Sequence, residues 1–102
     1  KQIELPKAAD YLFKSLKIKP NDPRVLEAIG IVYGSNEQFE ESIDYFNQAI
    51  ALDPTNANIV VNLGNTYYKK GDRITATECM KRAYSINPNL AETLAKVSKD
   101  FF

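Results

Sequence analysis

The chain has 102 residues, with 13 Lys and Arg against 13 Asp and Glu, 44% hydrophobic residues, and neither His nor Trp. This size and composition predict one small globular domain. A neutral chain with a pI near 6.5 lacks the positive charge that binding to nucleic acids or anionic membranes requires, so neither is an expected partner.

The residue types needed for common catalytic and metal sites are scarce. Without His, and with Cys79 as the single cysteine, the chain offers no His/Cys zinc site, no Ser-His-Asp triad and no internal disulfide. The adjacent acids Glu40 and Glu41 are typical of a solvated helix start, whereas a catalytic pair needs a desolvated cleft. The sequence therefore predicts no enzyme activity, no cofactor and no metal.

Cys79 and the first residues bear on where the protein acts. Cys79 precedes the apolar Met80 on a predicted helix with no activating base nearby, which favours a packing role over a reactive thiol. One unpaired cysteine suits a reducing compartment, so we expect a cytoplasmic protein. The chain begins without an initiator Met or a signal peptide, so we expect it to be a piece of a longer protein.

A repeat of 34 residues is the strongest feature of the sequence. Within each unit, apolar residues recur at i, i+3, i+4 and i+7 in two segments, which indicates amphipathic helices. The residues that recur unchanged are Gly30 as Gly64, Tyr33 as Tyr67, Ala49 as Ala83, and Pro20 as Pro54 and Pro88.

Six helices are predicted in chain order: 6–18, 23–35, 39–52, 57–70, 73–86 and 91–102. Asp22 before Pro23 and Asn56 before Ala57 are typical helix N-caps. Gly71 ends one helix and Asp72 caps the next. The Asp-Pro and Asn-Pro steps at 53–54 and 87–88 end the helices before them, because a residue that precedes Pro is pushed out of the α region.

The motif Leu26-x-x-Ile29-Gly30-x-x-Tyr33, followed by Phe46, Ala49 and Pro54 and repeated 34 residues later, resembles the tetratricopeptide repeat (TPR). The resemblance implies an all-α solenoid of antiparallel helix pairs with a right-handed superhelix. It also implies one TPR domain over 1–102. Its parts are the second helix of a partial repeat (1–22), two full repeats (23–56 and 57–90), and the first helix of a partial or capping repeat (91–102).

Half-repeats at both ends leave apolar surface uncovered, because stacked repeats are stabilised by their neighbours. On the first helix we expect this surface at Tyr11, Leu12, Leu16 and Ile18. The chain therefore either belongs to a longer solenoid or associates with itself through an end, as a homo-oligomer.

Two other local patterns have ordinary interpretations. Gly30 and Gly34 have the GxxxG spacing of membrane helix pairs, but the flanking segments are charged and Gly30 is already a repeat position. The longest aliphatic run, 59–61, is far shorter than the roughly 20 residues that span a bilayer. Lys69-Lys70 is interpreted as a solvated face balanced by Asp72.

In this family a groove lined by the first helix of each repeat commonly holds a peptide or a helix of a partner protein. Asn58, Asn62, Asn65 and Lys69 follow at i, i+4, i+7 and i+11, which places them on one helix face. Each Asn amide both donates and accepts hydrogen bonds and can therefore hold a peptide backbone; the alternative is plain solvated surface. The resemblance implies these groove candidates: Arg24, Glu27, Ala28, Ile31, Asn58, Val61, Asn62, Asn65, Lys69, Glu92, Lys96 and Lys99.

The predicted function is non-catalytic binding of a protein or peptide. Asn62 and Asn65 would bond the ligand backbone. Acidic ligand residues would be favoured by Lys69, Lys96 and Lys99, and apolar contacts would come from Ile31, Val61 and Tyr68.

Three other hypotheses compete with this function. The segment 62–65 is similar to an asparagine pattern in glycosyltransferase repeats, so the chain could be the recognition segment of a larger enzyme. An architectural oligomerisation module is also open. The carboxylate clamp of cochaperones is disfavoured, because Glu27, Ile31 and Glu92 stand where it requires Lys, Asn and Lys.

Overall fold

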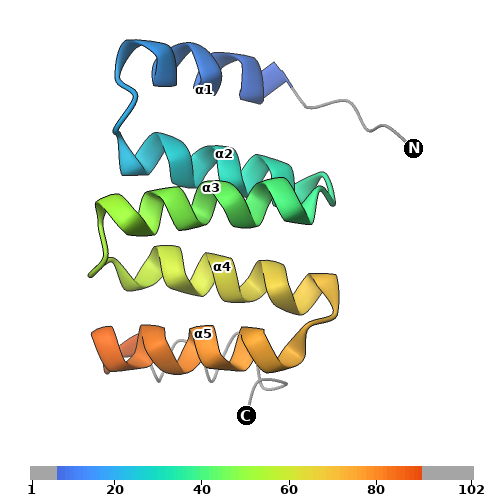
Figure 1. Ribbon diagram of the computed structural model, residues 1–102, viewed down its shortest axis with the longest axis vertical. Helices are drawn as coiled ribbons and strands as arrows, with labels where there is room; N and C mark the ends of the chain where they lie inside the picture. The colour runs from blue at the N-terminus through green and yellow to red at the C-terminus, as the bar shows by residue number, and fades with distance from the viewer. Residues whose placement is uncertain (1–6, 91–102) are drawn as a thin grey trace.

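The computed structural model describes residues 7–90, apart from the side chain of Ala8. Within that range the chain forms five α-helices and no strand, and the helices lie one beneath the next in antiparallel order (Figure 1). They match the predicted ranges, while the sixth predicted helix, 91–102, lies outside the described residues. The helices are α1 (Lys7–Ile18), α2 (Pro23–Ser35), α3 (Phe39–Leu52), α4 (Ala57–Lys70) and α5 (Arg73–Ile86).

Side-chain caps explain where three helices begin. The Asp22 carboxylate accepts a hydrogen bond of 3.0 Å from the Arg24 backbone N–H, and Pro23 needs no partner at the first helical position. The Asn56 side chain accepts from the backbone of the second residue of α4. Asp72 accepts from the N–H and the hydroxyl of Thr75 at the start of α5. These predicted caps are confirmed.

The turns within the two helix pairs differ at equivalent positions. Gly71 ends α4 in the left-handed region at φ 102°. Its equivalent, 34 residues earlier, is Glu37, which adopts φ 61° between α2 and α3. A left-handed backbone suits Gly and costs energy in other residues, so the first turn carries a strain that the second avoids.

The two repeat glycines let paired helices approach closely. A Cβ on Gly30 would lie 2.8 Å from ring atoms of Phe46, and one on Gly64 would lie 2.9 Å from Met80 Cε and 3.0 Å from Cys79 Cβ. Since Phe46 and Met80 are almost fully buried, little space is left for an added methyl group. The missing side chains of Gly30 and Gly64 thus allow the helices of each pair to pack closely.

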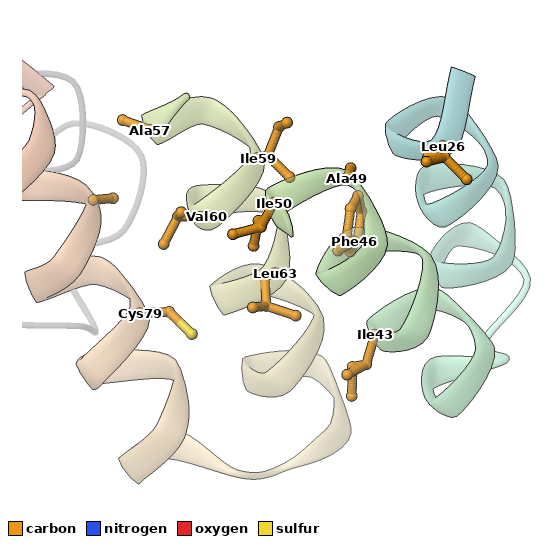
Figure 2. Close-up of a cluster of buried hydrophobic side chains, with 11 residues drawn as sticks. Leu26, Ile43, Phe46, Ala49, Ile50, Ala57, Ile59, Val60, Leu63 and Cys79 are labelled. Carbon is orange, nitrogen blue, oxygen red and sulfur yellow. The ribbon is translucent and has the colours of Figure 1, made fainter. Parts of the chain in front are cut away.

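The main core runs through the middle of the stack and is filled by residues of α2, α3, α4 and α5 (Figure 2). α3 contributes the largest buried side chain, Phe46, with Ala49 and Ile50 beside it. Its neighbour α4 contributes Ile59 and Leu63. α3 is thus packed on both sides, against α2 and α4.

Ser42 on α3 is buried where the next repeat unit has Ala76. Its hydroxyl donates a 2.6 Å hydrogen bond to the carbonyl oxygen of Gly30 and lies 3.4 Å from the Thr66 hydroxyl. Thr66 in turn donates to the carbonyl of Asn62. Both buried hydroxyls are therefore satisfied, which burial of a polar group requires.

α1 packs against α2 through only part of its surface. The Phe13 ring meets the Tyr33 and Tyr45 rings edge-on at 6.4 and 6.1 Å, and the two tyrosine rings stack at 5.5 Å. Tyr11 and Ile18 are 72% and 87% exposed, as predicted for an uncovered end. Leu12 and Leu16 are half-buried instead, and Leu16 packs against the main core.

None of the helices in residues 7–90 is both long enough and apolar enough to cross a membrane. The same part of the chain contains no group of three or more His, Cys, Asp or Glu residues that could hold a metal ion.

Candidate functional site

A small hollow opens between α2 and α4, above the side chain of Phe46 from α3. Its volume is about 110 Å³. The residues that line it are buried (Gly30, Phe46 and Thr66), half-buried (Gly34, Asn62 and Asn65) or exposed (Ile31, Ser35 and Lys69).

Four of the predicted groove residues meet at this hollow. Ile31 comes from α2, and Asn62, Asn65 and Lys69 come from one face of α4. Two helices from different predicted repeats therefore supply the hollow, and α2 and α4 touch directly.

Other predicted residues lie elsewhere. Arg24 is exposed and pairs with Asp22 at 3.5 Å, and Asn58 is exposed at the start of α4. Ala28 is half-buried on α2 and does not line the hollow. Val61 is half-buried and packs against Ala76 and Met80. Glu92, Lys96 and Lys99 lie outside the described residues.

A hydrogen bond across the two helices fixes one of the two central asparagines. Asn62 Nδ2 donates to Glu27 Oε2 at 2.8 Å. The amide nitrogen of Asn62 is thus already engaged, although its oxygen is left as an acceptor. Asn65 has no side-chain hydrogen bond within residues 7–90, so its amide keeps both donor and acceptor capacity for a ligand.

The two adjacent lysines of α4 are in different situations. Lys70 Nζ lies 2.8 Å from Glu40 Oε2, which is a different partner from the predicted Asp72. Its hydrogen bond to Glu40 raises the pKa of the Lys70 ammonium group. Lys69 has no ion pair among the described residues and lies at the rim of the hollow. Lys69 is therefore the cation that is available to a bound group.

Tyr68 faces α5 rather than the hollow. The Arg73 guanidinium carbon lies 5.1 Å from the centre of the Tyr68 ring, and Arg73 Nη2 donates to the Tyr68 hydroxyl at 3.0 Å. This is the geometry of a cation–π contact. Tyr68 is thus engaged with the second helix of its own pair.

Cys79 lies in the core beside Gly64. Burial raises the pKa of its thiol, which disfavours the reactive thiolate form. These observations agree with the packing role predicted from the sequence.

Five residues that line the hollow are not among the predicted groove residues: Gly30, Gly34, Ser35, Phe46 and Thr66. Of these, Gly30 and Phe46 are positions of the repeat motif. A signal for Gly34 was present, because Gly30 and Gly34 are spaced i, i+4 and so lie on one helix face. Thr66 is i+4 from Asn62, so the same spacing places it on that helix face, and its hydroxyl donates to the Asn62 carbonyl.

Family profiles match most of the described chain: "TPR repeat" covers residues 32–71, and "Tetratricopeptide repeat" covers residues 57–90. The chain belongs to the tetratricopeptide repeat family. Repeats of this family act as protein-interaction modules through extended surfaces of stacked helices, and the repeat itself is typically non-catalytic.

Two curated relatives are much longer than this chain. It is 30% identical over 106 residues to Protein O-mannosyl-transferase TMTC1 of Homo sapiens, with 97% of the chain and 12% of the relative covered. It is 32% identical over 92 residues to the anaphase-promoting complex subunit CDC16 of Saccharomyces cerevisiae, with 83% of the chain and 11% of the relative covered. The chain thus spans about a tenth of the length of these relatives.

Among solved structures, YrrB, a TPR protein with an unusual peptide-binding site, matches with a TM-score of 0.80 and 27% sequence identity. The match covers 90% of this chain and 46% of YrrB. It shows that the helical solenoid described here has a close structural counterpart.

Proposed function

We propose that the chain binds an extended segment of a partner protein along the surface formed by α2 and α4, and that it has no catalytic role itself. The observation that carries this proposal is the meeting of Ile31, Asn62, Asn65 and Lys69 at one hollow. All four are predicted groove residues, and they come from two helices. The peptide-binding site of YrrB and the family's role in protein interaction support the same function.

Each residue of the hollow has a part in this binding. Asn65 bonds the ligand backbone through its unengaged amide, and Asn62 offers its oxygen while Glu27 holds its nitrogen. Lys69 favours an acidic ligand residue at the end of the hollow. Ile31 is 47% exposed and provides apolar contact.

The surface extends beyond the hollow. Arg24, Glu27 and Asn58 continue it along α2 and α4, whereas Val61 packs against Ala76 and Met80. The later repeat would add Lys96 and Lys99. In this arrangement the chain consists of two full repeats, 23–56 and 57–90, with partial repeats at 1–22 and 91–102.

The test is a selection of random 12-residue peptides displayed on phage against the immobilised chain. Synthetic copies of the enriched peptides are then titrated by fluorescence polarisation. Replacing Asn65 with Ala should weaken binding by about 1–3 kcal/mol, because a hydrogen-bonding partner is lost on one side only. The matched control is Asn47→Ala, an exposed asparagine on α3. Equal affinity for both variants would contradict binding at the hollow.

The second candidate is a recognition segment within a larger enzyme. Alignment of 97% of the chain with 12% of an O-mannosyl-transferase favours it. Two measurements test it. The natural polypeptide should be long enough to contain a catalytic domain, and Asn65→Ala in that polypeptide should change which substrates the enzyme accepts. A short natural chain of a few repeats contradicts it.

The third candidate is an architectural module that joins copies of itself, and the exposed Tyr11 and Ile18 of α1 favour it. Light scattering over a wide concentration range measures the solution mass. A dimer or larger assembly that Ile18→Lys abolishes supports this role, whereas a constant monomer mass contradicts it.

A further inference from the structure

The helices α2 and α4 together contain four charged side chains, and two of these are neutralised. Arg24 and Lys70 form ion pairs of 3.5 and 2.8 Å with acidic residues outside the two helices. The other two are Glu27 on α2 and Lys69 on α4, and neither has an ion pair within residues 7–90. One unpaired charge of each sign is therefore left on the proposed binding surface.

These two charges lie at opposite ends of the hollow. α2 and α4 run in the same direction (Figure 1). Glu27 precedes Ile31 by one helical turn, and its carboxylate is held beside α4 by the 2.8 Å hydrogen bond from Asn62. Lys69 follows Asn62 by seven residues, which is about 10 Å along the axis of α4. Asn65 lies on the same face between these two levels.

The hydrogen bond from Asn62 positions the Glu27 carboxylate without neutralising it. The amide is uncharged, and it engages only the Oε2 atom. Because Glu27 is half-buried, its charge is screened less than on an open surface, and a cation that approaches it is attracted more strongly. Helix-dipole stabilisation does not account for Glu27, since it is the fifth residue of α2 and lies beyond the first turn.

The separation of the two charges fits a short stretch of extended peptide. In a polyproline II conformation, residues three positions apart lie on the same side of the chain, about 9 Å from each other. In a β conformation the same holds for residues four positions apart, at about 13 Å. Glu27 and Lys69 are separated by about 10 Å along the helices, and they also stand on different helices. Both peptide spacings therefore match.

We infer that α2 and α4 recognise an extended partner segment that carries a basic and an acidic residue three or four positions apart. Glu27 binds the basic residue, Lys69 binds the acidic residue, and Asn65 bonds the backbone between them. A uniformly acidic or uniformly basic segment would meet a like charge at one end and be disfavoured. This inference rests on the proposed binding surface and adds the charge pattern of its ligand.

Two neutral variants test the two ends separately. Glu27→Gln removes the negative charge and keeps a side-chain oxygen that can accept from Asn62, and Lys69→Gln removes the positive charge. The matched controls are Glu41→Gln on α3 and Lys81→Gln on α5, which change the net charge equally at exposed positions that do not line the hollow. Thermal unfolding of all four variants shows whether any has lost stability, since a cation in the last turn also favours α4 itself.

Random 12-residue peptides on phage are selected on the native chain, and synthetic copies are titrated by fluorescence polarisation. We expect a basic and an acidic residue to be enriched three or four positions apart. Replacing the basic residue of such a peptide with Gln should weaken binding about fivefold on the native chain and on the controls, and less than about twofold on Glu27→Gln. Replacing the acidic residue should give the same result with Lys69→Gln. Both losses should shrink when the salt is raised from about 0.05 M to about 0.5 M.

The outcomes distinguish the inference from the proposed function. If peptides lose affinity on Asn65→Ala, but the loss from replacing their charged residues is the same on the native chain and on both neutral variants, the charge pattern is overturned and the binding surface stands. A dependence on Glu27 alone or on Lys69 alone likewise overturns the paired pattern. If Asn65→Ala leaves affinity unchanged, or nothing is enriched, both are overturned. Dependence of the basic residue on Glu27 and of the acidic residue on Lys69 supports the pattern.

Discussion

The pairs α2–α3 and α4–α5 are built on the same 34-residue pattern, yet only some of their equivalent positions agree. Gly30 and Gly64 face Phe46 and Met80 in the same way, and Ala49 and Ala83 are both fully buried. The positions that differ include Gly34 against Tyr68 and Glu37 against Gly71. Packing between paired helices is thus held constant, and the residues that vary shape the surface and the turn.

The largest expected effect is at the core position that Phe46 occupies on α3 and Met80 occupies on α5, the second helix of each pair. Phe46→Ala should lower the free energy of unfolding by about 3–5 kcal/mol, because it leaves a cavity beside Gly30. Met80→Ala should cost less, since α5 packs on α4 alone among the described helices, whereas α3 is packed on both sides. Urea denaturation followed by circular dichroism measures both. A larger loss for Met80→Ala would contradict the central role of α3.

The two glycines of α2 should respond differently to the same substitution. Gly30→Ala should destabilise by about 1–3 kcal/mol, because the added Cβ overlaps the Phe46 ring. Gly34→Ala requires only a small shift of the Ser42 hydroxyl and gains helix propensity, so its loss should be below about 1 kcal/mol. The same urea titration compares them, and equal losses would show that Gly34 is also a packing position.

The turn between α2 and α3 should become more stable when it receives the glycine found at the equivalent position between α4 and α5. Glu37→Gly should raise the free energy of unfolding by about 1 kcal/mol, since Gly adopts φ 61° without the cost that Glu bears. The reverse control, Gly71→Ala, should destabilise the chain at φ 102°. A stability unchanged by Glu37→Gly would mean that the Glu37 side chain offsets its backbone strain.

The smallest effect concerns the cap of α5. Hydrogen bonds from the Thr75 backbone and hydroxyl hold the pKa of the Asp72 carboxyl below its usual value near 4. Because this pKa is lowered by folding, the stabilisation is present above pH of about 4 and is lost as the pH falls through the lowered value. Asp72→Asn keeps a capping group but has no carboxylate to titrate. The free energy of unfolding of this variant should therefore fall less than that of the native chain as the pH is lowered through 4. If the native chain and Asp72→Asn lose the same stability below pH 4, the Asp72 carboxylate does not contribute in this way.

Repeat spacing and local chemistry allowed the described helices and three of their caps to be predicted. Asp22, Asn56 and Asp72 act on residues two or three positions away, so their roles are visible in a short sequence window. The i, i+3 and i+7 spacings likewise placed Asn62, Asn65 and Lys69 on one face.

Contacts between distant helices could not be predicted in the same way. The bond from Asn62 to Glu27 and the ion pair of Lys70 with Glu40 join residues about one repeat apart. They depend on the relative rotation of two helices and on side-chain rotamers. Spacing indicated that Asn62 lies on the groove face, but it could not show that its nitrogen is already engaged.

The three-ring contact of Phe13, Tyr33 and Tyr45 has a consequence for how the molecule opens. Each described helix packs on its sequence neighbour, and α1 packs mainly on α2, while its Phe13 ring also meets Tyr45 of α3. The stacked Tyr33 and Tyr45 rings therefore join α2 to α3, and the edge-on contacts of the Phe13 ring secure α1. Native-state opening should begin there, with the amide hydrogens of α1 exchanging through a local detachment while those of α3 exchange only when the whole chain unfolds.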